Sequence, residues 1–217
     1  MSSIGQIREQ IEREIFDYQA LLQCLSGYAK PRDKIKRLLD AGDVIRVKKG
    51  LYVFGAPFRR RPVTRELLAN LIYGPSYISL DYALAWHGLI PERVTTVTSV
   101  AIGRSRDFIT PFGTFSYRSL SEARYAAGVL LEHCENDSFL LASPEKALAD
   151  KVWDDKRFSG ATLAEYDAYF ADDLRVDGDR LRHLDENRLE TVRAAYKSRK
   201  IDRLAQYIHT LRESANA

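Results

Sequence analysis

The stretch PRDKIKRLLDAGDVIRVKKGLYVFG, Pro31–Gly55, joins a helix pattern to a hairpin pattern. Pro31 suits the first turn of a helix, where its missing N–H would have no partner anyway. Three apolar residues then recur at i, i+3 and i+4 and predict one buried helix face, made of Ile35, Leu38 and Leu39. The sequence therefore predicts an amphipathic helix that begins at or near Pro31.

The residues after this helix predict two short strands. Gly42 can adopt the left-handed conformation that ends a helix. The apolar residues of VIRV (44–47) and LYV (51–53) then predict strands joined by a turn at Lys48–Gly50. A helix that leads into a cationic two-stranded hairpin is typical of a winged helix-turn-helix, so the first hypothesis is DNA binding.

The basic residues gather in the same part of the chain. The 217 residues carry a formal net charge of +3, but residues 1–62 hold thirteen Lys and Arg against seven Asp and Glu. The remaining residues hold twenty Lys and Arg against twenty-three Asp and Glu. This distribution is typical of a nucleic-acid-binding module beside a near-neutral domain.

The bulk properties favour a soluble cytoplasmic protein. With 45% hydrophobic residues, the chain can form one large core or two modest ones. The two cysteines, Cys24 and Cys134, make neither a disulfide framework nor a CxxC metal site. The N-terminus, SSIGQIREQIEREIF, lacks the apolar core of a signal peptide, and no apolar run approaches the ~18 residues of a membrane span. We therefore expect no metal, no cofactor and no membrane contact.

The N-terminal part is predicted to be helical up to the hairpin. Apolar residues follow the helical period from Ile4 to Leu25, with Asp17 as a cap between two helices. Ser26–Gly27 breaks the pattern, so FDYQALLQCL, SGYAK and PRDKIKRLLD predict helix, turn and helix. Ala56–Pro62, APFRRRP, disfavours both a helix and a central strand because of its two prolines. The predicted organisation is a winged helix-turn-helix domain at residues 1–56, a linker at residues 57–63 and a second domain at residues 64–217.

The second domain is predicted to mix helices and strands before a helical tail that follows Thr162. Ser143-Pro144-Glu145 has the cap, the proline and the acidic residue that begin a helix. The predicted fold class is α+β, an N-terminal winged helix-turn-helix followed by a mixed α/β C-terminal domain. The elements predicted in this domain are helices at Thr64–Ile72, Ser79–His87, Ser143–Asp154 and Lys200–Arg212, and strands at Val94–Ile102, Phe108–Ile109, Thr114–Arg118, Val129–Leu131 and Phe139–Leu141.

Two blocks of the second domain resemble a known family. Together with the winged-helix pattern, LIYGPSYISLDYALAWHGLIPERV (Leu71–Val94) and ASPEKALAD (Ala142–Asp150) resemble the AbiEi-type antitoxins. These are the regulator half of type IV toxin–antitoxin systems, which act in abortive infection, a form of phage defence. The resemblance covers most of the chain from Phe16 to Asp155. This chain departs from it by an extra N-terminal helix and by the helical tail.

The resemblance implies a transcriptional regulator and antitoxin with no enzymatic activity. The winged helix would repress its own operon by binding an inverted-repeat operator as two copies, because one winged helix covers too few base pairs. The C-terminal domain would support antitoxicity and assist DNA binding. The implied partner is a nucleotidyltransferase-like toxin encoded next door, and direct contact between the two proteins stays open. The alternatives are a stand-alone winged-helix regulator and a nucleic-acid-modifying enzyme with a winged-helix targeting module.

The DNA-binding candidates are basic or aromatic residues around the hairpin and its helix. The second helix of a helix-turn-helix enters the major groove, so Arg32 and Lys36 are the candidates for base contacts. Any single one of these charges is equally explained as a solvated surface charge, but eleven Lys and Arg against three Asp and Glu between Lys30 and Arg61 favour binding. The other candidates, for phosphate, are Tyr28, Lys30, Lys34, Arg37, Arg46, Lys48, Lys49, Arg59, Arg60 and Arg61.

No residue is predicted to be catalytic. His87 with Glu92 would suit general acid–base chemistry, but a histidine that ends a helix is better explained by bonds to last-turn carbonyls. Lys146 and Asp150 suggest a carboxylate–lysine site, yet capping at Ser143 and burial of one helix face account for this segment. We expect Ser143–Asp150 to organise the C-terminal domain or a partner surface.

Overall fold

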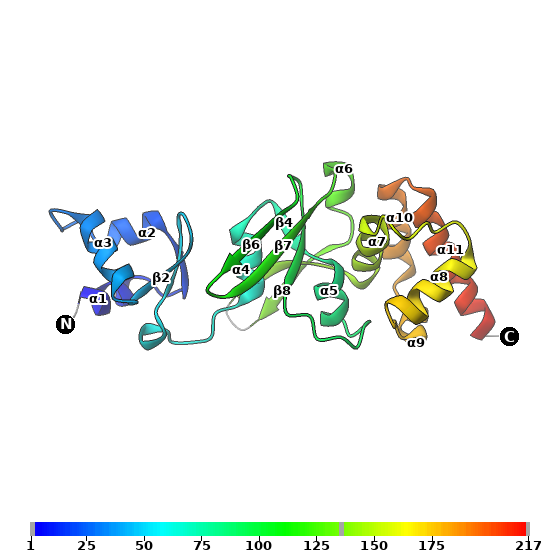
Figure 1. The fold of residues 1–217 in the computed structure, drawn as a ribbon, viewed down its shortest axis with the longest axis horizontal. Coiled ribbons are helices and arrows are strands. Elements are labelled where there is room, and N and C mark those ends of the chain that lie inside the picture. Colours follow the sequence, from blue (N-terminus) through cyan, green and yellow to red (C-terminus); the bar gives the residue numbers. More distant parts are fainter. Residues whose placement is uncertain (1–2, 135–136, 216–217) are drawn as a thin grey trace.

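A computed structural model of the protein describes residues 3–134 and 137–215 (Figure 1). The fold is mixed α+β, as predicted. The molecule is elongated, with a small N-terminal unit at one end, a large sheet in the middle and a group of helices at the other end (Figure 1). The two termini therefore lie at opposite ends of the molecule.

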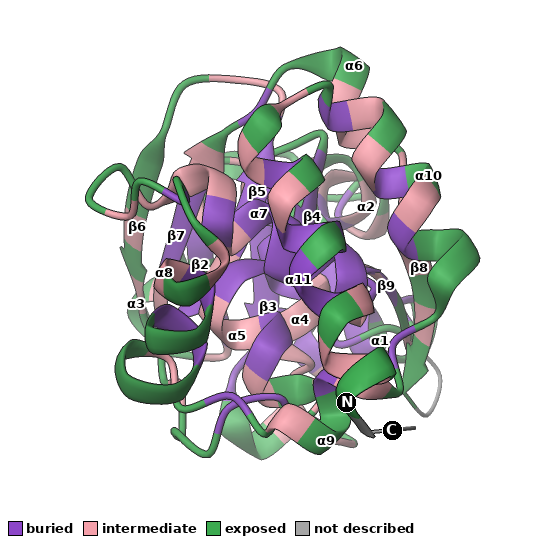
Figure 2. Cartoon of the chain, turned by 90° about the vertical axis from the view of Figure 1, so that its right-hand side faces the viewer, coloured by how far each residue is buried: buried purple, intermediate pink, exposed green. Residues whose placement is uncertain are grey.

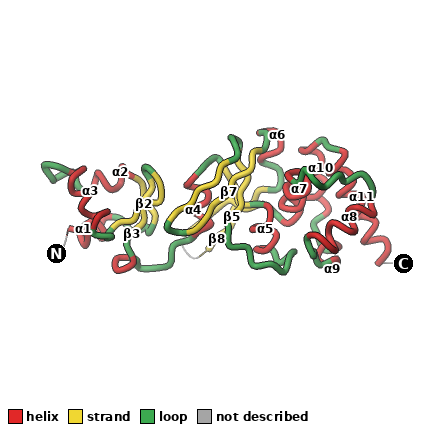
Figure 3. The backbone as a smooth tube through the Cα atoms, viewed as in Figure 1, coloured by secondary structure: helices red, strands yellow, loops and turns green. Residues whose placement is uncertain are grey.

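The N-terminal unit packs helices on a three-stranded antiparallel sheet of order β1-β3-β2. This sheet lies between helices α1–α3 and the rest of the molecule (Figure 3). The predicted cap is confirmed, because the Asp17 side chain accepts a hydrogen bond from Ala20 N at 2.8 Å. The elements are α1 (Ser3–Gln10), β1 (Ile15–Asp17), α2 (Tyr18–Cys24), α3 (Pro31–Asp40), β2 (Val44–Lys48) and β3 (Leu51–Phe54).

The predicted helical region from Ile4 to Leu25 is wrong in its middle. The backbone leaves α1 after Gln10 and forms strand β1, in which Ile15 lies opposite Val53 of β3. Isoleucine and phenylalanine favour strands when a pleated partner is present, and the partner here is remote in sequence. Tertiary pairing thus outweighs the helical period of the apolar residues in this segment.

The predicted hairpin is confirmed. Strands β2 and β3 pair antiparallel, with an irregularity between Arg46 and Lys48. Gly42 and Gly50 adopt φ angles of +74° and +88°, which only glycine adopts without strain. A single 3₁₀ turn, η1 (Ala56–Phe58), follows the hairpin. The domain boundaries at residues 56 and 63 stay predictions.

The middle of the molecule is a six-stranded mixed sheet of order β6-β7-β5-β4-β9-β8. The β6–β7 and β8–β9 hairpins confirm the predicted strands. Central strand β4 was not predicted, and it pairs antiparallel with β5 and parallel with β9. The elements are α4 (Arg65–Ile72), β4 (Ser76–Ile78), α5 (Leu80–Trp86), β5 (Val97–Ala101), β6 (Arg106–Thr110), β7 (Gly113–Ser119), α6 (Glu122–Tyr125), β8 (Val129–Cys134) and β9 (Asp137–Ala142).

Helices cover the C-terminal end, and the predicted helical tail is confirmed. The Ser143 hydroxyl accepts a hydrogen bond from Lys146 N at 3.2 Å and caps the first of these helices, as predicted. The elements are α7 (Pro144–Asp154), α8 (Leu163–Ala168), the π-helical turn η2 (Tyr169–Asp173), α9 (Gly178–Arg182), α10 (Glu186–Tyr196) and α11 (Arg199–Ala215).

Two groups of buried apolar side chains hold the fold together. The first joins α1, α2 and α3 to one side of the small sheet, around Leu21 and Phe54. The second fills the middle and C-terminal parts (Figure 2), and it also takes in Val47, Leu51 and Val53 from the small sheet. The small sheet therefore packs on both sides. None of the helices within residues 3–134 and 137–215 has the length and apolar character needed to cross a bilayer.

Candidate functional site

Helix α3 presents a cationic face to solvent. Ile35 and Leu38 are buried in the first core, as the apolar period predicts. Arg32, Lys36 and Arg37 lie on the other side of the helix and are exposed. An amphipathic helix with a basic outer face can lie in a DNA groove without losing its own packing. Both candidates for base contacts are therefore free to reach a ligand.

The turn before α3 adds Tyr28 and Lys30 to this surface, and Lys34 in the first turn of α3 lies beside them. The Tyr28 side chain is 40% exposed. The Lys34 ammonium lies 6.0 Å from the centre of the Tyr28 ring, at the outer limit of a cation–π contact. Lys30 is exposed at the N-cap position of α3 and makes no side-chain cap bond. These three side chains extend the basic, solvent-exposed surface of α3.

The two lysines predicted at the hairpin turn, Lys48 and Lys49, have different environments. Lys49 is exposed at the turn, and Arg46 is exposed on β2. The Lys48 ammonium instead donates a hydrogen bond to the carbonyl oxygen of Ile72, at the C-terminus of α4. Partial burial lowers the pKa of Lys48 below its usual value. Lys48 is thus engaged with the middle of the molecule, unlike Lys49.

All three linker arginines have partners within the protein, and two of them are partly buried. The Arg59 Nε donates to Phe54 O at 2.8 Å, and its guanidinium lies 5.3 Å from the centre of the Phe112 ring. Arg61 forms an ion pair with Asp137 at 3.6 Å. Arg60 is exposed. The predicted cationic stripe across the linker is therefore interrupted, and Arg60 is its most accessible member.

A buried polar network, which was not predicted, lies between the sheet and the C-terminal helices. Lys146 and Asp150 form an ion pair at 3.2 Å on successive turns of α7, with side-chain exposures of 0% and 1%. The Asp150 carboxylate also accepts hydrogen bonds from Tyr77 at 2.9 Å, from Ser79 at 2.6 Å and from Tyr196. The network connects β4, α7 and α10 across the core.

Every proton of the Lys146 ammonium is directed to an oxygen. Besides Asp150, it donates to Arg124 O at 2.6 Å and to the Tyr196 hydroxyl at 3.0 Å. Burial lowers the pKa of Lys146, and the Asp150 charge acts in the opposite direction. Burial and the same carboxylate hold the pKa of Tyr196 well above its usual value. Such saturation stabilises a buried ion pair and leaves the ammonium no free donor for a substrate.

The sequence contains one signal that points to this network. Lys146 and Asp150 are four residues apart in a helix whose neighbours Ala147, Leu148 and Ala149 are completely buried. A helix that is apolar around most of its circumference is buried on several sides. Charged residues in such a helix require partners from other elements, and the identity of those partners is visible only in the fold.

His87 and Glu92 do not form the acid–base pair considered above. His87 Nε2 makes a hydrogen bond of 2.8 Å with Ala142 O, at the end of β9. The expectation that His87 bonds a last-turn carbonyl is therefore wrong, because the ring reaches across to the neighbouring strand. Glu92 pairs with Arg175 at 3.1 Å. His87 thus ties the end of α5 to the sheet, and Glu92 ties the loop after α5 to the loop before α9.

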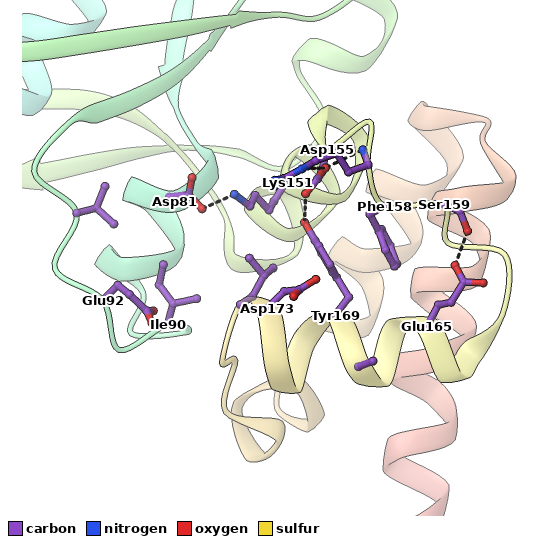
Figure 4. Close-up of a pocket in the computed structure, with 14 residues that line it drawn as sticks. Asp81, Ile90, Glu92, Lys151, Asp155, Phe158, Ser159, Glu165, Tyr169 and Asp173 are labelled. Carbon is purple, nitrogen blue, oxygen red and sulfur yellow. Dashed lines mark hydrogen bonds and ion pairs between the residues drawn. The ribbon is translucent and has the colours of Figure 1, made fainter.

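A pocket with a volume of about 910 Å³ lies between α5, α7, α8 and η2 (Figure 4). Some of its charged groups are engaged with protein groups: Asp81 forms an ion pair with Lys151 at 2.6 Å, and the Asp155 carboxylate accepts a hydrogen bond from the Tyr169 hydroxyl at 3.3 Å. Phe158 stacks on Tyr169, with ring centres 4.0 Å apart. Because its lining holds five Asp and Glu against two Lys and Arg, the pocket offers a phosphate group less electrostatic attraction than the α3 face does.

Comparison with models of known protein families and with curated proteins gave no match.

Proposed function

We propose that the protein binds duplex DNA through α3 and the β2–β3 hairpin, in the manner of a winged helix-turn-helix. The observation that carries this proposal is the division of α3 into a buried face, with Ile35 and Leu38, and an exposed face, with Arg32 and Lys36. Arg and Lys on the outer face of such a helix suit the acceptors of guanine in the major groove. Tyr28, Lys30, Lys34, Arg37, Arg46 and Lys49 supply phosphate contacts around it.

We further propose that the protein is the antitoxin and autorepressor of a type IV toxin–antitoxin operon. The support is the resemblance of Leu71–Val94 and Ala142–Asp150 to AbiEi-type antitoxins. These two blocks supply Tyr77 and Ser79 on one side of the buried network and Lys146 and Asp150 on the other. The distinctive residues of both blocks thus meet in one interior contact, which agrees with a shared architectural role.

The proposed activity is binding, with no chemical step. Lys146 and Asp150 are the charged pair that most resembles catalytic machinery, and their burial keeps them from any substrate. The proposed partners are an inverted-repeat operator bound by two copies and a nucleotidyltransferase-like toxin encoded by the neighbouring gene. A toxin-rescue assay tests the second part: coexpression of this protein restores growth of cells that express the neighbouring gene. Absence of rescue contradicts the antitoxin assignment.

Removing the side chains proposed to contact bases should lower both the affinity and the sequence specificity of operator binding. We expect Arg32→Ala and Lys36→Ala each to cost about 1–3 kcal/mol of binding free energy and to relax sequence preference. Fluorescence anisotropy with the DNA upstream of the gene, against a scrambled duplex, measures both effects. Arg199→Ala, which removes an exposed arginine from α11, is the matched control and leaves affinity unchanged. Equal losses in the control and in the α3 variants contradict the proposed interface.

The two hairpin lysines should behave differently. Lys49→Ala removes an exposed charge and is expected to weaken binding to all DNA sequences alike. The slope of log affinity against log salt should start near −4.5, which corresponds to roughly 5 phosphates. The substitution should lower the magnitude of this slope by about 1. Lys48→Ala loses a bond to Ile72 O and is expected to leave the salt slope unchanged. The measurement is DNA affinity from low to moderate salt. A larger slope change for Lys48→Ala than for Lys49→Ala reverses this assignment.

A further inference from the structure

A second cationic feature lies where α1 meets the linker, outside α3 and the hairpin. An open pocket of about 450 Å³ is lined there by four arginines and two glutamates. It involves the extra N-terminal helix, for which the resemblance gives no role. The residues that line it are Arg8, Glu12, Arg13, Glu14, Arg60 and Arg61.

One side of the pocket is a rigid buried framework. Arg8 and Glu14 form an ion pair with side-chain exposures of 7% and 3%. Arg8 Nε also donates to Phe58 O at 3.0 Å, and the backbone N–H of Arg60 donates to Glu14 Oε1 at 3.2 Å. These bonds fix the linker against α1 and the loop after it. The shape of the pocket is therefore set by buried contacts.

The other side of the pocket carries guanidinium groups available to a ligand. Arg13 and Arg60 are exposed, and neither forms an ion pair with a carboxylate within the described residues. Arg60 makes only a long side-chain contact, 3.5 Å, to Arg8 O. Burial lowers the pKa of Arg8, the Glu14 charge raises it, and Arg60 and Arg61 lower it further. Like charges thus face one another across the pocket.

We propose that this pocket binds a phosphate group. Guanidinium groups present paired N–H donors that match phosphate oxygens, and a bound dianion would offset the repulsion among the arginines. Arg13 and Arg60 make the contacts, while the Arg8–Glu14 ion pair fixes the wall beside them. The phosphate belongs either to the DNA backbone, in which case the site extends the proposed function, or to a free phosphorylated molecule.

Calorimetric titration of the full-length protein with inorganic pyrophosphate tests the pocket without DNA. We expect saturable binding that Arg13→Ala/Arg60→Ala weakens about tenfold or more, because two charge-assisted contacts are lost. Arg188→Ala/Arg199→Ala removes two exposed arginines from the C-terminal helices and leaves binding unchanged. Glu12→Gln removes an exposed negative charge from the pocket and is expected to tighten binding. All these positions are exposed, so folding is retained.

DNA titrations with the same variants identify the source of the phosphate. If the pocket holds backbone phosphates, Arg13→Ala/Arg60→Ala lowers the magnitude of the salt slope by about 2 without changing sequence preference. If pyrophosphate binding falls and the DNA slope does not change, the ligand is a free phosphorylated molecule. Absence of saturable pyrophosphate binding, or binding that the double variant leaves unaltered, overturns the proposal. The pyrophosphate result does not depend on α3, so it stands or falls separately from operator binding.

Discussion

Replacement of Asp150 by alanine is expected to lower the free energy of unfolding by about 3–5 kcal/mol. The substitution leaves the Lys146 ammonium buried with no counter-charge, and it removes the acceptor of the Tyr77, Ser79 and Tyr196 hydroxyls. Each orphaned group then bears its own desolvation cost. Urea unfolding followed by circular dichroism measures the change.

Two further variants separate the lost ion pair from a general effect of substitution. Lys146→Met/Asp150→Leu removes both charges, so it is expected to be less destabilising than Asp150→Ala alone. Asp172→Ala changes an exposed carboxylate and is expected to lie within about 0.5 kcal/mol of the parent protein. A loss below about 1 kcal/mol for Asp150→Ala would show that the network is not a buried ionic contact of the kind described.

Replacement of Gly55 by alanine is expected to destabilise the N-terminal unit by about 3 kcal/mol or more and to abolish DNA binding. Gly55 N donates to Asp43 O at 2.8 Å, which holds the end of β3 against the turn after α3. A Cβ atom at Gly55 would overlap the carbonyl oxygen of Gly42, a backbone atom with no rotamer to relieve the clash. The end of the hairpin must therefore move away from α3.

Gly27→Ala is the matched control for Gly55→Ala. No heavy atom lies within 4 Å of a Cβ built at Gly27, and its φ lies outside the left-handed region. Amide hydrogen exchange of α1–β3 and operator affinity are the two measurements. Protection and affinity fall for Gly55→Ala and persist for Gly27→Ala. Unchanged operator affinity in Gly55→Ala would mean that DNA binding by α3 does not require its packing against the hairpin.

Local patterns were sufficient to predict the elements whose stabilising contacts are close in sequence. Helix α3, the β2–β3 hairpin and the Ser143 cap are defined by neighbours within a few residues. Strands β1 and β4 have three residues each, and their partners lie far along the chain. A three-residue strand has too few alternations to carry a periodic signal, so its existence depends on pairing that local sequence does not encode.

The difference between local and remote contacts also explains which residues of the candidate interface could be predicted. The exposure of Arg32 and Lys36 follows from the apolar period of α3 itself. The engagement of Lys48 with Ile72 and of Arg61 with Asp137 depends on contacts between residues remote in sequence. A basic side chain has the same local signature whether it meets solvent or a carbonyl oxygen. The count of charged residues therefore located the basic region, but it overestimated how many of its lysines and arginines are available to a ligand.

The position of β4 in the sheet determines the order in which the chain can fold during synthesis. β4 pairs with β5 soon after both leave the ribosome, but its other neighbour is β9, where Leu141 lies opposite Ile78. Until β9 emerges, this apolar strand is an open edge that can pair with another chain. The sheet can also close before Tyr196 has been synthesised and can donate its hydrogen bond to the Asp150 carboxylate. The N-terminal unit, whose strand pairs are all complete by Phe54, can form first, while the large sheet stays open to such pairing until β9 has been synthesised.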